Sequence, residues 1–190
     1  MLNINKIIEI FISLQIIIVS TFIPVFISIP FTNSLLKTSE IPISWQITSI
    51  ILLTLLFNGE IVIKSFSIYL LIGLLILPIF HNGGSLGYLL TPNFGYLIGT
   101  YPLIKIVDKL NKKSHKIHYY DILRYGFFGI CSMHIIGIIY CIIQSLLFKQ
   151  SDLLIYNISK YSLGKFGYHL LMLTPITLFS KLINNKRNVQ

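Results

Sequence analysis

Alanine is absent from this chain, and charged residues make up only 11% of its 190 residues. Soluble domains carry roughly 25% charged residues, whereas this chain has a hydrophobic fraction of 54% and a mean hydropathy of +0.79. Isoleucine, leucine, asparagine and lysine take the place of alanine, a bias typical of AT-rich genomes, so no single Ile or Asn is given weight. The composition predicts an integral membrane protein.

The sequence also lacks the motifs of common catalytic and metal-binding sites. It contains no Walker A, G-x-S-x-G or H-E-x-x-H motif. Its six acids are scattered and form no pair at the spacing of a metal site or an acid–base dyad. Cys131 and Cys141 fall ten residues apart in one expected helix, where a disulfide between them is geometrically impossible. We therefore expect no enzyme activity, no metal and no cofactor.

Acids are few, and the net charge is +9. In a soluble protein this would raise nucleic acid as a partner, but here the basic residues lie at the ends of apolar runs, where the positive-inside rule explains them. No nucleic-acid partner is expected.

Apolar runs predict an all-α fold of six transmembrane helices in one bundle, within a single domain spanning residues 1–190. A membrane-spanning helix needs about 20 residues. The expected spans are residues 7–27, 45–57, 61–77, 92–106, 122–148 and 167–182. An Asn-Gly turn separates the second span from the third. Residues 28–44, 105–124 and 149–165 are expected to be loops, the second of them beginning as a helix extension.

The charges predict the orientation of these spans. With six spans both termini lie on one side, which also carries most of the lysines, so the termini are expected in the cytoplasm. The outer side would carry only Lys37, Lys149, Lys160 and Lys165. The membrane is expected to be the plasma membrane, with an organellar membrane as the alternative.

Residues 77–99 are rich in glycine and contain no acid, lysine or arginine. Glycine permits close backbone approach and positive φ, and irregular backbone at membrane depth needs a covering of protein or a water-filled cavity. One interpretation is a lid over, or a wall of, a small-molecule site; the other is a compact linker between two helices. In the predicted topology this segment and residues 28–44 meet on the outer side.

Two polar side chains inside the fifth span, His134 and Tyr140, have two interpretations. Intramembrane polar groups usually face the interior of a bundle. They therefore either join two helices through hydrogen bonds or contact a substrate.

Four segments together follow a pattern known from one family of membrane proteins. They are residues 42–46 (PISWQ), residues 73–80 (GLLILPIF), residues 83–99 (GGSLGYLLTPNFGYLIG) and residues 137–140 (GIIY). Their order and spacing resemble the BioY family, the biotin-specific substrate-binding (S) components of energy-coupling factor (ECF) transporters.

The resemblance implies a protein in the lipid bilayer with a biotin pocket open to the outside. Its implied partners are a transmembrane coupling subunit and two cytoplasmic ATPase subunits. Biotin or a related small vitamin would be the ligand. The residues that this interpretation assigns to substrate binding are Trp45, Gln46, Gly83, Gly84, Gly87, Tyr88, Asn93, Tyr96, His134, Tyr140, Tyr168 and His169.

The chain departs from the family pattern at the start of the last span. Many members carry P-G-D-x-x-K there, and this chain has Tyr168 and Leu171 at the positions of the Asp and Lys. The ligand's carboxylate is then expected to meet His169, Lys165 or Lys160, unless the ligand differs. The alternative functions are a membrane scaffold or assembly protein without a ligand and, disfavoured by the lack of a polar stripe, a small-solute channel.

Overall fold

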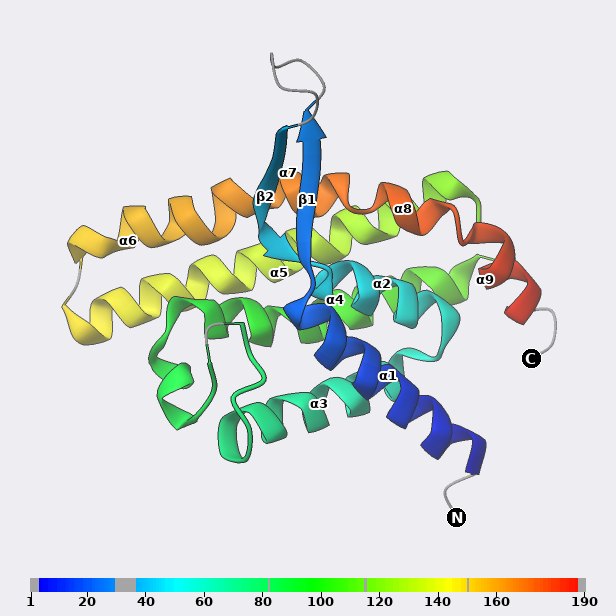
Figure 1. The fold of residues 1–190 in the computed structure, drawn as a ribbon, viewed down its shortest axis with the longest axis horizontal. Coiled ribbons are helices and arrows are strands. Elements are labelled where there is room, and N and C mark those ends of the chain that lie inside the picture. Colours follow the sequence, from blue (N-terminus) through cyan, green and yellow to red (C-terminus); the bar gives the residue numbers. More distant parts are fainter. Residues whose placement is uncertain (1–3, 30–36, 82, 115, 150, 188–190) are drawn as a thin grey trace.

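The computed structural model describes residues 4–29, 37–81, 83–114, 116–149 and 151–187 (Figure 1). Helices dominate it, and the predicted all-α bundle is observed. The helices are α1 (Ile4–Phe22), α2 (Gln46–Leu56), α3 (Gly59–Leu75), the 3-10 helix η1 (Leu86–Leu90), α4 (Pro92–Lys113), α5 (Tyr119–Phe148), α6 (Ser151–Ile158), the π-helical turn η2 (Ser159–Leu163), α7 (Gly164–Leu171), α8 (Thr174–Thr177) and α9 (Ser180–Arg187).

The first span ends earlier than the sequence predicts. Helix α1 stops at Phe22, and the antiparallel strands β1 (Pro24–Ile29) and β2 (Lys37–Ser44) follow in place of a loop over residues 28–44. Val25 is buried while Phe26 is exposed, and Ile41 and Ile43 are buried on β2. This alternation has the period of two that a strand requires, and it was hidden by the overall apolarity of the segment. The part of the predicted loop at residues 30–36 lies outside the described residues.

The predicted division between the second and third spans is confirmed. Helices α2 and α3 meet at Asn58, whose Oδ1 accepts a hydrogen bond from the Glu60 backbone N–H at 3.2 Å and so caps α3. The Gly59 N–H donates to Asp108 Oδ1 of α4 at 3.0 Å. The turn between α2 and α3 is therefore hydrogen-bonded to α4.

The loop predicted over residues 149–165 is wrong, because a helical run begins at Ser151 and continues through α6, η2 and α7. Polar residues in this stretch suppress its mean hydropathy. On the surface of this helical run, however, Lys160 Nζ lies 5.5 Å from the centre of the Tyr156 ring and 5.3 Å from that of Tyr161. Lys160 and Lys165 therefore belong to the last helical run rather than to an outer loop.

Helices α4 and α5 lie side by side at the centre of the molecule (Figure 1). Glycines permit their close approach: a Cβ added at Gly99 would lie 2.6 Å from the Met133 carbonyl oxygen. The predicted extension of the fourth span into the charged segment is confirmed, since α4 continues to Lys113.

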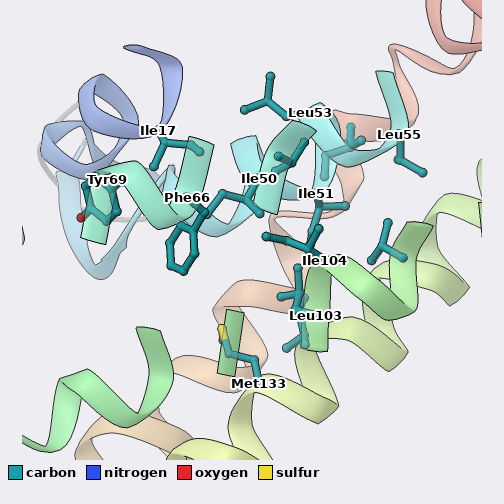
Figure 2. Close-up of a cluster of buried hydrophobic side chains, with 14 of the residues drawn as sticks. Ile17, Ile50, Ile51, Leu53, Leu55, Phe66, Tyr69, Leu103, Ile104 and Met133 are labelled. Atoms are coloured by element: carbon teal, nitrogen blue, oxygen red, sulfur yellow. The ribbon is translucent and has the colours of Figure 1, made fainter. Parts of the chain in front are cut away.

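A buried apolar cluster fills the space between α1, α2, α3, α4 and α5 (Figure 2). Ile17, Ile50 and Phe66 are fully buried within it. Large apolar side chains also remain exposed on the outer faces of the helices, including Phe11 and Ile139. Within the described residues, α1 and α5 are the helices that are long and apolar enough by themselves to cross a membrane.

Candidate ligand-binding site

One cavity lies where β2, the start of α2, the glycine-rich segment, α4 and the last helical run converge. Its volume is about 100 Å³, and part of it opens to solvent. Pro42 and Ser44 line it from β2, and His81 and Tyr88 line it from the glycine-rich segment. The two segments that the sequence places on the outer side thus meet at the same cavity.

The glycine-rich segment holds its shape through backbone hydrogen bonds. Phe80 and Gly83 exchange two of them, at 2.8 and 3.0 Å, and Gly83 adopts a φ of +120° that favours glycine. The Ser85 N–H donates to the Gly73 carbonyl at 3.0 Å. A Cβ at Gly84 would lie 2.6 Å from that same carbonyl oxygen, so a side chain at this position would displace the segment.

Tyr88 fixes the same segment against the bundle. Its hydroxyl donates to the His81 carbonyl at 3.2 Å, and its ring centre lies 4.7 Å from that of Phe80. Burial raises the pKa of the Tyr88 phenol above its ordinary value of 10.0. From α5, the Tyr140 hydroxyl donates to the Leu89 carbonyl. The segment is therefore a packed cover and not a loop extending into solvent.

Two buried polar atoms belong to residues of the cavity wall and have no hydrogen-bond partner among the described residues. They are Nε2 of Gln46, at the start of α2, and the hydroxyl oxygen of Tyr96 on α4. A buried polar group without a partner is costly, and native structures contain few of them. Gln46 and Tyr96 both line the cavity, so they are candidates to contact a polar ligand there.

The ionisable lysine and histidine side chains of the wall are all basic. Lys165, His169 and His81 line the cavity, and no acid is among the described residues that line it. Lys165 is half-buried, with its Nζ 5.3 Å from the centre of the Tyr161 ring. A cation in such a partly desolvated position attracts anions more strongly than it would in water. The cavity therefore favours a ligand with an anionic group.

Behind His169 the polar side chains continue into the bundle. His169 Nδ1 lies 3.1 Å from His134 Nε2, and His134 Nδ1 lies 2.8 Å from the Ser162 hydroxyl oxygen. His134 and Ser162 are each only 4% exposed. His134 thus joins α5 to the last helical run, and it lies behind the cavity wall, hydrogen-bonded to His169.

The structure brings five of the predicted site residues into the cavity wall. These are Gln46, Tyr88, Asn93, Tyr96 and His169.

The other predicted residues lie around this wall. Trp45 borders a separate apolar groove between α1 and α2. Tyr140 holds the glycine-rich segment, and His134 lies behind His169. Tyr168 is 39% exposed and does not line the cavity.

The three predicted glycines belong to the cover and do not line the cavity. Gly83 and Gly84 shape the segment, as described above. Gly87 has open space beside it, since the nearest atom to an added Cβ is the Ser85 hydroxyl oxygen at 3.5 Å.

Two lining residues, His81 and Tyr161, were not singled out from the sequence. His81 precedes the glycines and resembles an ordinary turn residue. Tyr161 reaches the cavity from the π-helical turn η2. A π turn shifts the register of a helix and is frequent at functional sites, but hydropathy periodicity does not reveal it. Of the two lysines considered for the carboxylate, Lys165 lines the cavity and Lys160 does not.

Comparison with known proteins agrees with the architecture. The BioY family model matches residues 2–164. A probable biotin transporter BioY from Lysinibacillus sphaericus is 42% identical over 59 residues, which are 31% of this chain and only 30% of that relative. The crystal structure of the S-component for biotin from an ECF-type ABC transporter superposes with a TM-score of 0.66 at 20% identity, covering 99% of this chain and 95% of that one. This chain belongs to the BioY family, and its fold is that of a multi-pass membrane protein.

Proposed function

We propose that this protein is the substrate-capture (S) subunit of an ECF-type vitamin transporter and that it binds biotin in the cavity described above. One observation carries the proposal. The wall combines unpartnered polar atoms, on Gln46 and Tyr96, with basic side chains and no acid. Biotin has the complementary groups, since it carries a ureido ring at one end and a carboxylate at the other.

The two ends of the ligand fit two parts of the wall. A ureido carbonyl accepts hydrogen bonds, and Gln46 Nε2 is an amide donor without a partner. The carboxylate is suited to the ammonium of Lys165 and the ring of His169. Between them, Ile47, Leu97 and Met133 supply apolar surface for the bicyclic ring and the aliphatic chain.

The protein acts in this proposal as a transporter subunit and not as an enzyme. ATP hydrolysis would come from partner ATPases through a transmembrane coupling subunit. The glycine-rich cover lies at the end of the helices opposite both termini (Figure 1). The lysine-rich end of α4 lies with the termini, and under the positive-inside rule this supports cytoplasmic termini and a cavity at the outer face of the plasma membrane.

Titration calorimetry with purified protein in lipid nanodiscs tests the proposal. We expect saturable binding of biotin at one site per chain. Lys165→Met should weaken binding by about 10-fold, because it removes a charge-assisted hydrogen bond of roughly 1.5–3 kcal/mol.

Lys160→Met is the matched control, since Lys160 lies against the same Tyr161 ring but outside the cavity. Its affinity should stay within about 2-fold of the wild type, as expected for a surface charge. Absence of saturable biotin binding by the wild type would favour the alternative of a membrane scaffold without a ligand.

A further inference from the structure

The hydrogen-bonded chain of His169, His134 and Ser162 determines which ring nitrogen of His169 carries its proton. His169 Nδ1 is occupied by His134 Nε2 at 3.1 Å, so Nε2 is the ring nitrogen left for the cavity. A neutral imidazole has one donor nitrogen and one acceptor nitrogen. The direction of the chain therefore decides whether His169 offers a ligand a donor or a lone pair.

The imidazole ring of His134, in the middle of this hydrogen-bonded chain, is held in place by its neighbours. His134 packs edge-to-face against Tyr96, with ring centres 5.5 Å apart, and against Phe166, with ring centres 5.2 Å apart. Its Nδ1 meets the Ser162 hydroxyl at 2.8 Å. Because the ring is buried and bonded at both nitrogens, its orientation is fixed and only the positions of the protons can change.

Hydrogen-bond donation along Ser162, His134 and His169 can run in either of two directions with the same positions of the heavy atoms. In the first, the Ser162 hydroxyl donates to His134 Nδ1, His134 Nε2–H donates to His169 Nδ1, and His169 Nε2–H faces the cavity. In the second, every donor and acceptor is exchanged, and His169 faces the cavity with a lone pair. A serine hydroxyl can serve at the end of either chain because it both donates and accepts.

We propose that the chain runs in the first direction when ligand is bound, so that neutral His169 donates from Nε2 to the ligand's carboxylate. This rests on the proposed function, and it assigns the specificity for a carboxylate end group. A carboxylate only accepts hydrogen bonds, so the second direction would set two lone pairs against each other. His134 and Ser162 are positioning residues, which act on the ligand through His169 in the way that second-shell groups fix the tautomer of a metal-bound histidine.

Two substitutions of His134 separate this role from simple packing. In His134→Gln, the amide nitrogen takes the place of Nε2 and still donates toward His169 Nδ1. In His134→Asn, the shorter side chain places its amide near the position of Nδ1 and leaves His169 without that donor. Both variants lose the same ring contacts with Tyr96 and Phe166, so a structural role predicts similar losses for both.

The ligands to compare are biotin and biotinamide, whose neutral carboxamide offers both a donor and an acceptor. Biotinamide can meet either tautomer of His169, whereas biotin requires the donor. We expect His134→Asn to weaken biotin binding about 10-fold more than biotinamide binding, the size of a charge-assisted hydrogen bond. His134→Gln should keep the wild-type ratio of the two affinities.

Equal losses in the two variants, or an unchanged affinity ratio in His134→Asn, would overturn the inference while leaving biotin binding by the wild type intact. Wild-type protein that binds no biotin would overturn both this inference and the proposed function.

Nitrogen-15 NMR of the imidazole side chains tests the same point without a substitution in the measured protein. In the complex with biotin, His169 should show a protonated Nε2 and an unprotonated Nδ1. The signal of His134 is assigned by its loss in His134→Gln, and that of His169 by its hydrogen-bond coupling to His134. A His169 protonated at Nδ1, alone or together with Nε2, would overturn the proposal.

Discussion

Polar side chains inside this bundle are satisfied in two different ways. Some bond to their own helix: Thr54 Oγ1 donates to the Ile50 carbonyl at 2.7 Å, and Ser65 Oγ donates to the Ile61 carbonyl at 2.9 Å. At the cavity, Gln46 Nε2 and the Tyr96 hydroxyl have no such partner among the described residues. Under the proposed function, ligand binding would recover the desolvation cost of these two groups.

Replacement of Gln46 by leucine should separate stability from binding. Gln46→Leu removes a buried donor without a partner, so it should raise the free energy of unfolding of the ligand-free protein by about 1 kcal/mol. The same change should weaken biotin binding by at least about 10-fold, because the ureido carbonyl loses its donor. Thermal unfolding without ligand and calorimetric titration measure the two effects.

Thr54→Val on the same helix is the control for Gln46→Leu. Its hydroxyl serves only the Ile50 carbonyl, so its loss should leave the biotin affinity unchanged. A Gln46→Leu protein that is less stable and binds biotin normally would show that Gln46 is a structural residue.

Individual helices meet through glycines, and the contact atoms differ between positions. At Gly99 of α4, an added Cβ would lie 2.6 Å from a backbone oxygen of α5, which cannot move aside without bending the helix. At Gly167 of α7, nothing lies within 4 Å of an added Cβ. The same residue type therefore has a packing role in one helix and none in the other.

Gly99→Val should destabilise the bundle by about 1–3 kcal/mol, the usual cost of overpacking. Gly167→Ala should instead stabilise the protein by up to about 1 kcal/mol, because alanine favours a helix over glycine. Thermal unfolding in one detergent, with both variants measured beside the wild type, gives the comparison. Similar midpoints for Gly99→Val and the wild type would mean that α4 and α5 pack less closely than described here.

The glycine-rich cover offers a second matched pair. A Cβ at Gly84 would lie 2.6 Å from both the Gly73 oxygen and Pro78 Cα, whereas Gly87 has room for a methyl group. Gly84→Ala should displace the cover and weaken biotin binding by about 10-fold, on the order of 1.4 kcal/mol. Gly87→Ala should bind as the wild type does. Equal affinities in the two variants would indicate that the cover does not act in binding.

Sequence patterns predicted the helices that are apolar along their whole length, and they missed the elements that combine polar and apolar contacts. The long apolar runs of α3 and α5 gave correct spans because apolar surface surrounds them. The start of the last helical run was missed because Lys160 and Lys165 lie on aromatic rings, an interaction that no hydropathy average contains. The β1–β2 hairpin was missed because its exposed face, at Phe26, is itself apolar.

The same distinction applies to the site. Gln46, Asn93 and Tyr96 were found through the family resemblance, because their local motifs are preserved. His81 and Tyr161 were not found, since their place in the wall depends on a turn and a π-helical register that arise only in the packed bundle.

The two ends of the helical bundle differ in their content of charged residues. One end carries the Asp108–Lys112 ion pair, at 2.7 Å, and the charged residues that follow it on α4. The other end carries the uncharged glycine-rich cover. Because lysine and arginine are retained on the cytoplasmic side of a membrane, we expect this asymmetry to orient the protein with its cavity outward.

Thiol labelling in intact cells tests this orientation with two single substitutions. Ser85 lies in the cover and Lys113 at the end of α4, and both are exposed. A membrane-impermeant maleimide should modify Ser85→Cys in intact cells and Lys113→Cys only after permeabilisation. The wild type sets the background, since its cysteines lie within α5, Cys141 buried and Cys131 half-buried. Labelling of Lys113→Cys from outside, with Ser85→Cys protected, would invert the topology and place the cavity at the cytoplasmic face, where it could not capture an external vitamin.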